Sequence, residues 1–335
     1  MSSVEALAVE ACRVRLGLSP GPLQSPLEAD LAPTLMALEA EGLHGLVADL
    51  WLPHTERPEV RQVVGLCRLR HQRLGRELHC LASASPCDLL VFKGAATGTY
   101  LYQAGQRDCR DMDVQVGPSD RTAFVGMLRS RGYQTEAAEG NSYQRGVLQV
   151  DLHEHPLGLA ERLFPIPLDE IWAQSETLTG RMRRPSYEME FVLGLVHSAK
   201  HGFGRMVWLL DSALLLQRLP ASRVLPVVQR YGASRLLDYS LWAMVELFQM
   251  APPPGLEQAI RPWGQRGLLE RWLLTKIRQR RGTDRLGRLL LAFACPRPQA
   301  RWWLLRSLLW PPGLRLGEQL RRLPRLLQLL YQGEL

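Results

Sequence analysis

Hydrophobic residues recur along the chain in two rhythms, and the changes between them mark its parts. In residues 1–84 they recur every three or four positions, as in 59–81, where Val60, Cys67 and Leu78 alternate with arginines. One face of an α-helix repeats about every 3.6 residues, so this spacing predicts amphipathic helices. The first part of the chain is therefore expected to be helical.

The middle of the chain changes to the patterns of strands. Residues 88–92 form a short apolar run that ends in Lys-Gly, and residues 111–116 alternate polar with apolar, as a strand does when one face is buried. Two or three more strands are predicted over 132–135, 142–146 and 148–153, with helices at 95–102 and 118–130. This order predicts a small mixed α/β sheet.

After residue 171 the helical spacing returns and holds to the end of the chain. Helices are predicted at 187–201, 206–219, 222–231, 234–250, 268–281, 285–294, 299–309 and 315–331, with proline or glycine between many of them. We therefore expect an α+β fold, in which a small mixed-sheet core (85–180) lies between an N-terminal helical region (1–84) and a C-terminal helical domain (181–335).

Composition narrows the class of protein. Of the 335 residues 46% are hydrophobic, which excludes a disordered chain because enough apolar surface is available to offset chain entropy. The six cysteines are scattered without a C-x-x-C pair, which argues against a zinc ribbon and a disulfide framework. The N-terminus lacks the layout of a signal peptide, and no stretch approaches the roughly 18 apolar residues that span a bilayer. We expect a cytoplasmic protein.

The net charge of +8 comes almost entirely from arginine, since Lys93, Lys200 and Lys276 are the only lysines. Arginine-rich coding bias explains this composition, and the positive balance also fits an anionic partner: nucleotide, nucleic acid or acidic lipid. Charge alone does not choose among these. It does draw attention to the few lysines, because a compact ammonium is not always replaceable by arginine.

The sharpest chemical feature is a set of carboxylates on predicted strands. Asp111 and Asp113 are two residues apart, so their side chains point to the same face of their strand. Asp151 stands in an apolar frame on a later strand and can add a third carboxylate. Carboxylates side by side repel unless a cation lies between them, and two Mg²⁺ ions about 4 Å apart serve phosphoryl transfer in this way. A solvated strand edge is the alternative for the pair alone.

A second feature is Lys93-Gly94-Ala95, which directly follows one strand and opens a helix. Glycine lets a phosphate approach the backbone, and free N–H groups at a helix start favour an anion. The lysine side chain can reach phosphate oxygens. By contrast, His153 and His155 flank Glu154, and a His-Glu-His run on a strand is split between the two faces, which makes a poor zinc site.

Taken together, these motifs resemble the core of the DNA polymerase β-type nucleotidyltransferases. The run from Val91 through Lys93-Gly94, Arg107 and Asp111-Met-Asp113 is most similar to an uncharacterised nucleotidyltransferase family with a Lys-Gly signature, and the similarity continues through Asp151-Leu-His153. The helical segment His197-Ser-Ala-Lys200-His201, with Arg205, Trp208 and Asp211 after it, is similar to that family's helical motif.

The resemblance implies a nucleotidyltransferase core and specific roles. Asp111, Asp113 and Asp151 would hold two Mg²⁺ ions, and Asp151 would help to activate an acceptor hydroxyl. The substrate would be an NTP, whose nucleoside monophosphate passes to an unidentified acceptor with release of pyrophosphate. The nucleotide would be bound by residues from two segments: Lys93, Gly94, Ala95, Arg107, His197, Lys200 and His201.

Some readings stay open. The superfamily usually has Gly-Ser or Gly-Gly where this chain has Gly94-Ala95, and the lost hydroxyl motivates an alternative function: a non-catalytic nucleotide- or partner-binding accessory protein of a peptide-modification pathway. His197, Lys200 and His201 form either a cationic helical face or a buried hydrogen-bonded set. The acceptor is expected to be a small molecule, peptide or protein, and nucleic acid is not favoured because the arginines are dispersed.

The C-terminal segments 301–310 and 315–325 are apolar, aromatic and basic. Such a composition suits either the surface of an anionic membrane or packing on the helical domain, where arginine stems cover apolar surface. Packing is the favoured interpretation, and peripheral membrane contact is the alternative.

Overall fold

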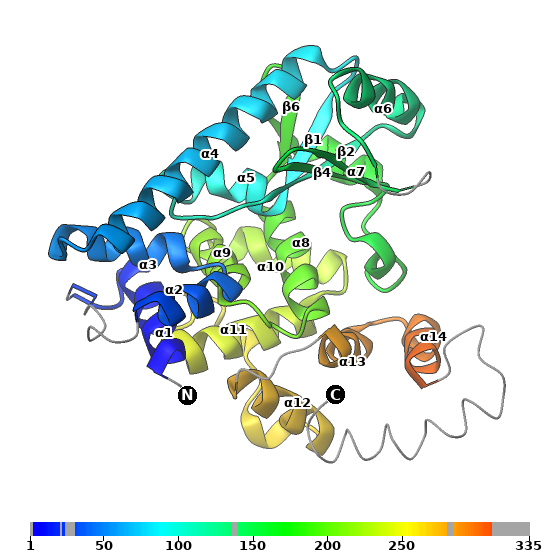
Figure 1. Cartoon of the computed structure of the whole chain (residues 1–335). Coiled ribbons are helices and arrows are strands. Elements are labelled where there is room, and N and C mark those ends of the chain that lie inside the picture. The colour runs from blue at the N-terminus through cyan, green and yellow to red at the C-terminus, as the bar shows by residue number, and fades with distance from the viewer. Residues whose placement is uncertain (1–2, 21, 24–30, 136–139, 280–283, 310–335) are drawn as a thin grey trace, which may run out of the picture. The chain divides into compact units, whose positions relative to one another are not determined.

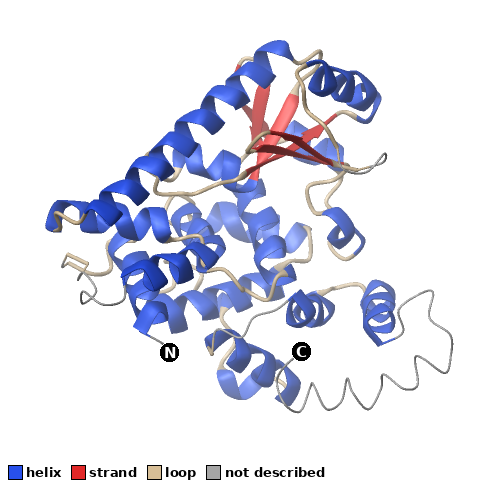
Figure 2. Cartoon of the chain, viewed as in Figure 1, coloured by secondary structure: helices blue, strands red, loops and turns tan. Residues whose placement is uncertain are grey.

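The computed structural model describes residues 3–20, 22–23, 31–135, 140–279 and 284–309. They fall into two compact units. The first takes in the described residues of 2–158 and 166–193, and the second those of 159–165 and from 194 onward. The sheet and the N-terminal helices therefore belong to one unit. Figure 2 shows the strands in red among the helices.

The first unit is built on a six-stranded mixed sheet with the order β3-β4-β2-β1-β6-β5. Its strands are β1 (Leu89–Phe92), β2 (Asp111–Val116), β3 (Ser142–Arg145), β4 (Leu148–His153), β5 (Ser175–Thr179) and β6 (Met182–Pro185). The central strand β2 pairs antiparallel with β1 and parallel with β4, and β1 pairs parallel with β6. This arrangement confirms the expected α+β class with a small mixed sheet.

The strands β2 and β4 have one apolar and one polar face, because their residues alternate as the sequence predicts. Met112 and Val114 on β2, with Val150 and Leu152 on β4, are fully buried and belong to one hydrophobic core. That core includes Leu74, Leu78 and Leu81 of α4, Ala95 and Ala96 of α5, and Phe124 and Leu128 of α6. Burying this face leaves the intervening carboxylates on the opposite one.

The first unit has helices within the regions 1–84, 95–102 and 118–130 where the sequence predicts them, and a short further helix, α7 (Leu168–Ala173), that was not predicted. The others are α1 (Ser3–Arg15), α2 (Leu31–Ala40), α3 (His44–Trp51), α4 (Pro58–Ala84), α5 (Lys93–Tyr100) and α6 (Arg121–Ser130). The long helix α4 runs beside the sheet in Figure 1. It begins at Pro58, whose fixed φ suits the first position of a helix.

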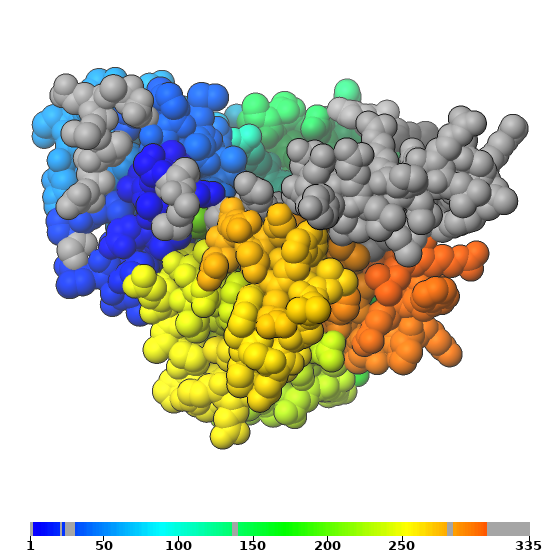
Figure 3. Space-filling view, turned by 90° about the horizontal axis from the view of Figure 1, so that it is seen from below, coloured from blue at the N-terminus to red at the C-terminus, as the bar shows by residue number. Residues whose placement is uncertain are grey.

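The second unit is helical, as predicted. α8 (Tyr187–Lys200) begins in the first unit and ends in the second, which continues with α9 (Met206–Leu216), α10 (Ala221–Arg230), α11 (Ser234–Phe248), α12 (Leu268–Arg278), α13 (Asp284–Ala294) and α14 (Pro298–Leu309). Figure 3 shows α12 and α14 at the surface of this unit. The helix predicted at 315–331 and the segment 315–325 lie outside the described residues.

None of the described helices combines the length and apolar character needed to cross a membrane. On α14, Trp302 and Trp303 are exposed, and the guanidinium of Arg162 lies 5.2 Å from the ring of Trp303.

Two sequence predictions were wrong. The helical pattern was expected to hold after residue 171, but residues 175–179 and 182–185 form the hairpin β5–β6. The hairpin lacks an apolar strand pattern because β5 lies at the edge of the sheet, where Glu176 and Thr177 are exposed. The two-residue connection at Gly180, which has φ +52°, was the available signal. The strand predicted at 132–135 is reduced to one bridge, between Gln134 and Gln144.

Candidate active site

The polar face of the sheet carries the three predicted carboxylates on two neighbouring strands. Asp111 and Asp113 alternate with buried apolar residues on β2, and Asp113 lies directly opposite Asp151 on the parallel strand β4. Neighbouring strands are about 4.8 Å apart, so the two carboxylates start from adjacent backbone positions. The pairing that places Asp151 beside the Asp111–Asp113 pair is a property of the sheet, since 38 positions separate Asp113 from Asp151 in the numbering.

Two cationic or proton-donating groups converge on the Asp113 carboxylate. Lys93 Nζ and His153 Nε2 each lie 2.6 Å from Asp113 Oδ1. Burial by itself would raise the pKa of Asp113, but the hydrogen bond from His153 and the charge and hydrogen bond of Lys93 outweigh burial and lower the pKa to about 2. Asp113 is therefore ionised throughout the neutral range, although its side chain is almost fully buried.

The pKa of Asp111 is shifted in the opposite direction, upward. Burial raises its pKa above the usual value, and the charges of Asp113 and Asp151 raise it further, while Lys93 opposes them. The thiol of Cys109 also lies beside this residue, 2.9 Å from the backbone oxygen of Asp111. Like charges thus remain in excess around Asp111, which is the electrostatic condition that a bound cation relieves.

Lys93 reaches Asp113 because of its place at the junction of β1 and α5. Phe92 pairs with Asp113 across the antiparallel strands, and Lys93 is the next residue. Its backbone is left-handed, with φ +56°, and its N–H donates to Glu190 Oε1 at 2.9 Å. A non-glycine residue in this conformation is strained by about 1–2 kcal/mol, so the surrounding structure holds it there.

Gly94 lies under the loop that leads into β2. A Cβ on Gly94 would come within 3.1 Å of Cys109 Sγ and 3.2 Å of Arg107 Nη2, so this close packing favours glycine. Arg107 is buried, and its Nη1 donates to the backbone oxygen of Asp108 at 3.0 Å. The structure therefore brings Arg107 to the start of α5, where the sequence placed the phosphate-binding segment.

Ala95, the departure from the usual phosphate loop, is buried in the hydrophobic core of the sheet. Its methyl group packs among apolar side chains, where a serine hydroxyl would need a buried hydrogen-bond partner. Packing therefore accounts for alanine at this position.

The second unit holds the remaining predicted residues. The rings of His197, His201 and Trp208 contact one another, with centroids 4.7–5.0 Å apart. His201 Nδ1 lies 2.7 Å from Asp284 Oδ1, and Arg205 lies over the Trp208 ring. His197, Lys200 and His201 are half-buried. The hydrogen-bonded, packed set therefore remains an alternative to the cationic face, and a role in nucleotide binding stays a prediction.

Two residues of the site, His153 and Glu190, were given no role beside Asp113 by the sequence motifs. His153 was named in the Asp151-Leu-His153 motif and rejected as a zinc ligand, yet it follows Asp151 at the spacing that puts both on one strand face. Gln115 shares the face of Asp113, and its amide oxygen accepts a hydrogen bond of 2.6 Å from Trp172 of α7. Glu190 carries no local signal, because its contact with Lys93 spans 97 positions.

The donor set fits a hard divalent cation. Three carboxylates supply only oxygen ligands, which Mg²⁺ prefers, and burial together with the charges of Asp113 and Asp151 raises the pKa of Asp111. Lys93 already neutralises part of the charge of Asp113. That Asp111, Asp113 and Asp151 hold the metal stays a prediction.

Comparison with known proteins gives one match. The profile of a family described as uncharacterised nucleotidyltransferase matches residues 34–249, which is well over half of the chain and includes every predicted site residue. No curated protein and no solved structure matches the chain.

Proposed function

The chain belongs to this uncharacterised nucleotidyltransferase family, and we propose that it transfers a nucleoside monophosphate from an NTP to an acceptor hydroxyl. The observation that carries the proposal is the placement of Asp111, Asp113 and Asp151 on one face of the neighbouring strands β2 and β4, with Lys93 at the start of α5 paired to Asp113. A small molecule, a peptide or a protein would supply the hydroxyl. The cytoplasm, where NTP is available, is the proposed compartment.

The reaction is written at the α-phosphorus. The acceptor oxygen forms a bond to this atom, the bond from the α-phosphorus to the bridging oxygen of the β-phosphate breaks, and pyrophosphate leaves. The acceptor's proton passes to the Asp151 carboxylate. Two Mg²⁺ ions bound to the carboxylates would supply charge neutralisation for the attacking and leaving oxygens.

The other residues bind and orient. Lys93 and Arg107 pair with phosphate oxygens, and the backbone at Gly94 lets the triphosphate approach the N-terminus of α5. His153 holds Asp113 ionised and fixes the direction of its carboxylate. In the second unit, His197, Lys200 and His201 are proposed to contact the nucleotide.

Label transfer distinguishes this reaction from its alternatives. The full-length protein is incubated with Mg²⁺, fractionated cell extract as the source of acceptor, and an NTP radiolabelled at either the α- or the γ-phosphate. We expect an acceptor labelled only from the α-position, with one pyrophosphate released per label. Asp113→Asn should lower the rate by at least about 10²-fold, and Asp169→Asn, at an exposed carboxylate of α7, should leave it unchanged.

The alternative accessory function gives a different pattern. A protein that only binds nucleotide would show an NTP-dependent rise in its unfolding temperature, without label transfer to any fraction. Binding that Asp113→Asn leaves unaltered, with no pyrophosphate from the wild type, would refute the transferase proposal. Loss of the temperature rise on chelation of Mg²⁺ supports the metal-dependent reading.

A further inference from the structure

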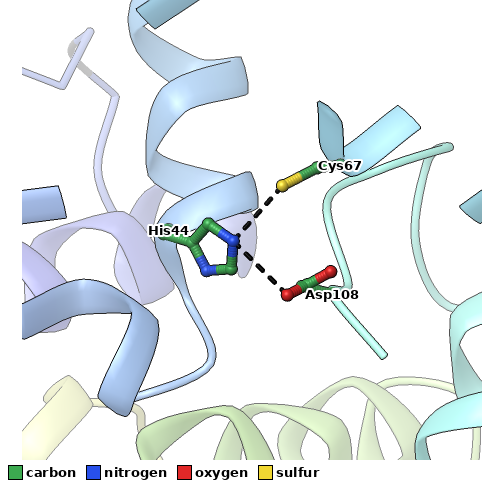
Figure 4. A group of neighbouring side chains, drawn as sticks. All are labelled: His44, Cys67 and Asp108. Carbon is green, nitrogen blue, oxygen red and sulfur yellow. Dashed lines mark hydrogen bonds and ion pairs between the residues drawn. The ribbon is translucent and has the colours of Figure 1, made fainter. Parts of the chain in front are cut away.

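A second group of metal-ligating side chains lies in the first unit, apart from the three carboxylates. His44 at the start of α3, Cys67 in α4 and Asp108 in the loop before β2 meet in a buried cluster, with exposed fractions of 6%, 2% and 8%. Figure 4 shows that the thiol and the carboxylate both face the same ring nitrogen of His44. Cys67 Sγ is 3.3 Å and Asp108 Oδ2 is 3.4 Å from His44 Nε2.

These separations fit a shared metal ion better than they fit hydrogen bonds. Two acceptors at one ring nitrogen would have to share a single N–H in a bifurcated hydrogen bond, and 3.4 Å is long for an N–H···O bond. A zinc ion at about 2.05 Å from a nitrogen or oxygen and about 2.3 Å from a sulfur, with tetrahedral angles, sets N···S near 3.6 Å and N···O near 3.3 Å. The observed distances lie within 0.3 Å of these edges.

A catalytic Cys-His-Asp arrangement does not describe the cluster. In such a triad the nucleophile and the carboxylate bind opposite nitrogens of the imidazole ring. Here both approach Nε2, whereas His44 Nδ1 is buried without a hydrogen-bond partner among the described residues. Asp108 Oδ1 is likewise buried without a partner in that part of the chain. With Cys67 almost fully buried, a substrate has no approach to its sulfur.

The backbone around the cluster is built for close approach. A Cβ on Gly45, the neighbour of His44, would lie 2.3 Å from the backbone oxygen of Gly105 and 3.3 Å from Cys67 Sγ. Glycine at position 45 therefore lets α3 approach both the loop and α4. The loop makes its turn at Gly105, which has φ +89°. The convergence of the three side chains thus depends on backbone contacts that larger residues would prevent.

We propose that His44, Cys67 and Asp108 bind one zinc ion, which ties α3 and α4 to the loop that leads into β2. The mixed nitrogen, sulfur and oxygen donors suit Zn²⁺ and not Mg²⁺. On binding, the Cys67 thiol releases its proton to solvent and its sulfur ligates the metal. Water or Asp108 Oδ1 completes the coordination.

Arginines balance this cluster when it holds no metal. Arg70 Nη1 and Arg110 Nε lie 3.2 and 3.7 Å from Asp108 Oδ2. Their side chains are about half exposed, so each can turn toward water as zinc takes over the charge of Asp108. Because Asp108 lies three positions before Asp111, zinc would anchor the segment that enters the carboxylate site. The zinc proposal itself does not rest on the proposed reaction.

Cobalt and zinc loading test the site. The full-length protein, freed of any affinity tag and stripped with a chelator, is titrated with Co²⁺ and separately with Zn²⁺. With excess Mg²⁺ present to occupy the carboxylate site, we expect one tightly bound Co²⁺ or Zn²⁺ per chain, a thiolate-to-cobalt charge-transfer band, the intense visible absorption of four-coordinate Co²⁺, and a higher unfolding temperature with Zn²⁺. Cys67→Ala and His44→Gln should abolish all four. Cys80→Ser, at an exposed cysteine on the same helix, should keep them.

The wild-type cobalt spectrum keeps the test decisive if Cys67→Ala fails to fold. Asp108→Asn, which preserves the shape of the side chain, should weaken zinc binding by at least tenfold. Substoichiometric metal, a cobalt spectrum without the thiolate band, or equal zinc binding by wild type and His44→Gln would each overturn the proposal and leave a buried polar cluster.

Discussion

Replacing Lys93 separates the work of its side chain from the strain of its backbone. Lys93→Ala and Lys93→Gly both remove the ammonium that pairs with Asp113. They differ in how much free energy the left-handed backbone conformation at this position costs, where φ is +56°. Alanine keeps the strain of about 1–2 kcal/mol, and glycine removes it but loses about 0.4–1 kcal/mol through the greater freedom of its unfolded chain.

The balance predicts that Lys93→Gly is more stable than Lys93→Ala by about 0.5–1 kcal/mol. The wild type also gains the ion pair. The drop in the pKa of Asp113 from its usual 3.8 to about 2 corresponds to about 2 kcal/mol, and Lys93 supplies only part of it because His153 also donates to Asp113. We therefore expect Lys93→Ala to lose about 1–2 kcal/mol against the wild type.

Urea unfolding of the metal-free protein at pH 7 measures these differences, provided that the three proteins unfold with the same denaturant slope. NTP binding with Mg²⁺ gives the second measurement, and both variants should bind at least tenfold more weakly because both lack the ammonium. Lys93→Ala equal to or more stable than Lys93→Gly would refute the argument from backbone strain. NTP binding that survives in both variants would refute the proposed phosphate contact.

Three further outcomes follow from single contacts. Gly94→Ala should fold but bind NTP at least tenfold more weakly in calorimetric titration, because its Cβ would displace Arg107; wild-type affinity would contradict this packing. Glu270→Gln should cost about 2 kcal/mol in urea unfolding at pH 7. The hydrogen bond from Arg261 outweighs burial and lowers the pKa of Glu270, so the difference in stability should shrink as pH falls below about 4.5 and the folded carboxylate protonates. A constant difference down to pH 3 would count against this linkage. In thermal unfolding, Gly287→Ala should destabilise the protein by more than about 2 kcal/mol, on the order of a severe core defect, because its Cβ would overlap the backbone at the end of α8. Gly65→Ala lies in open space on α4 and should stabilise the protein by about 0.5–1 kcal/mol. Similar effects at the two positions would show that the contact at residue 287 is unimportant.

Most of the secondary structure could be predicted from the local periodicity of apolar residues. The helices α4 and α8 to α14 and the strands β1, β2 and β4 were predictable within a few residues, because each has a strong apolar period and a clear breaker at its ends. The hairpin β5–β6 was not, since an edge strand satisfies its backbone on one neighbour and needs few apolar residues. Its Gly180 turn was a weaker signal than the surrounding helical pattern.

For the candidate site, the sequence by itself determined which residues share a strand face: Asp111 with Asp113, and Asp151 with His153. Only the tertiary structure decided that Asp113 and Asp151 are neighbours, that Lys93 and His153 share one carboxylate oxygen, and that Glu190 holds the Lys93 backbone.

The meeting of His44, Cys67 and Asp108 was also decided by the fold alone. Their spacings of 23 and 41 positions match no local motif, because helix packing and the turn at Gly105 bring them together. Side-chain direction within one strand or helix follows from backbone geometry and can be read from the sequence, whereas contacts between distant segments depend on strand register and on how closely the backbones can approach.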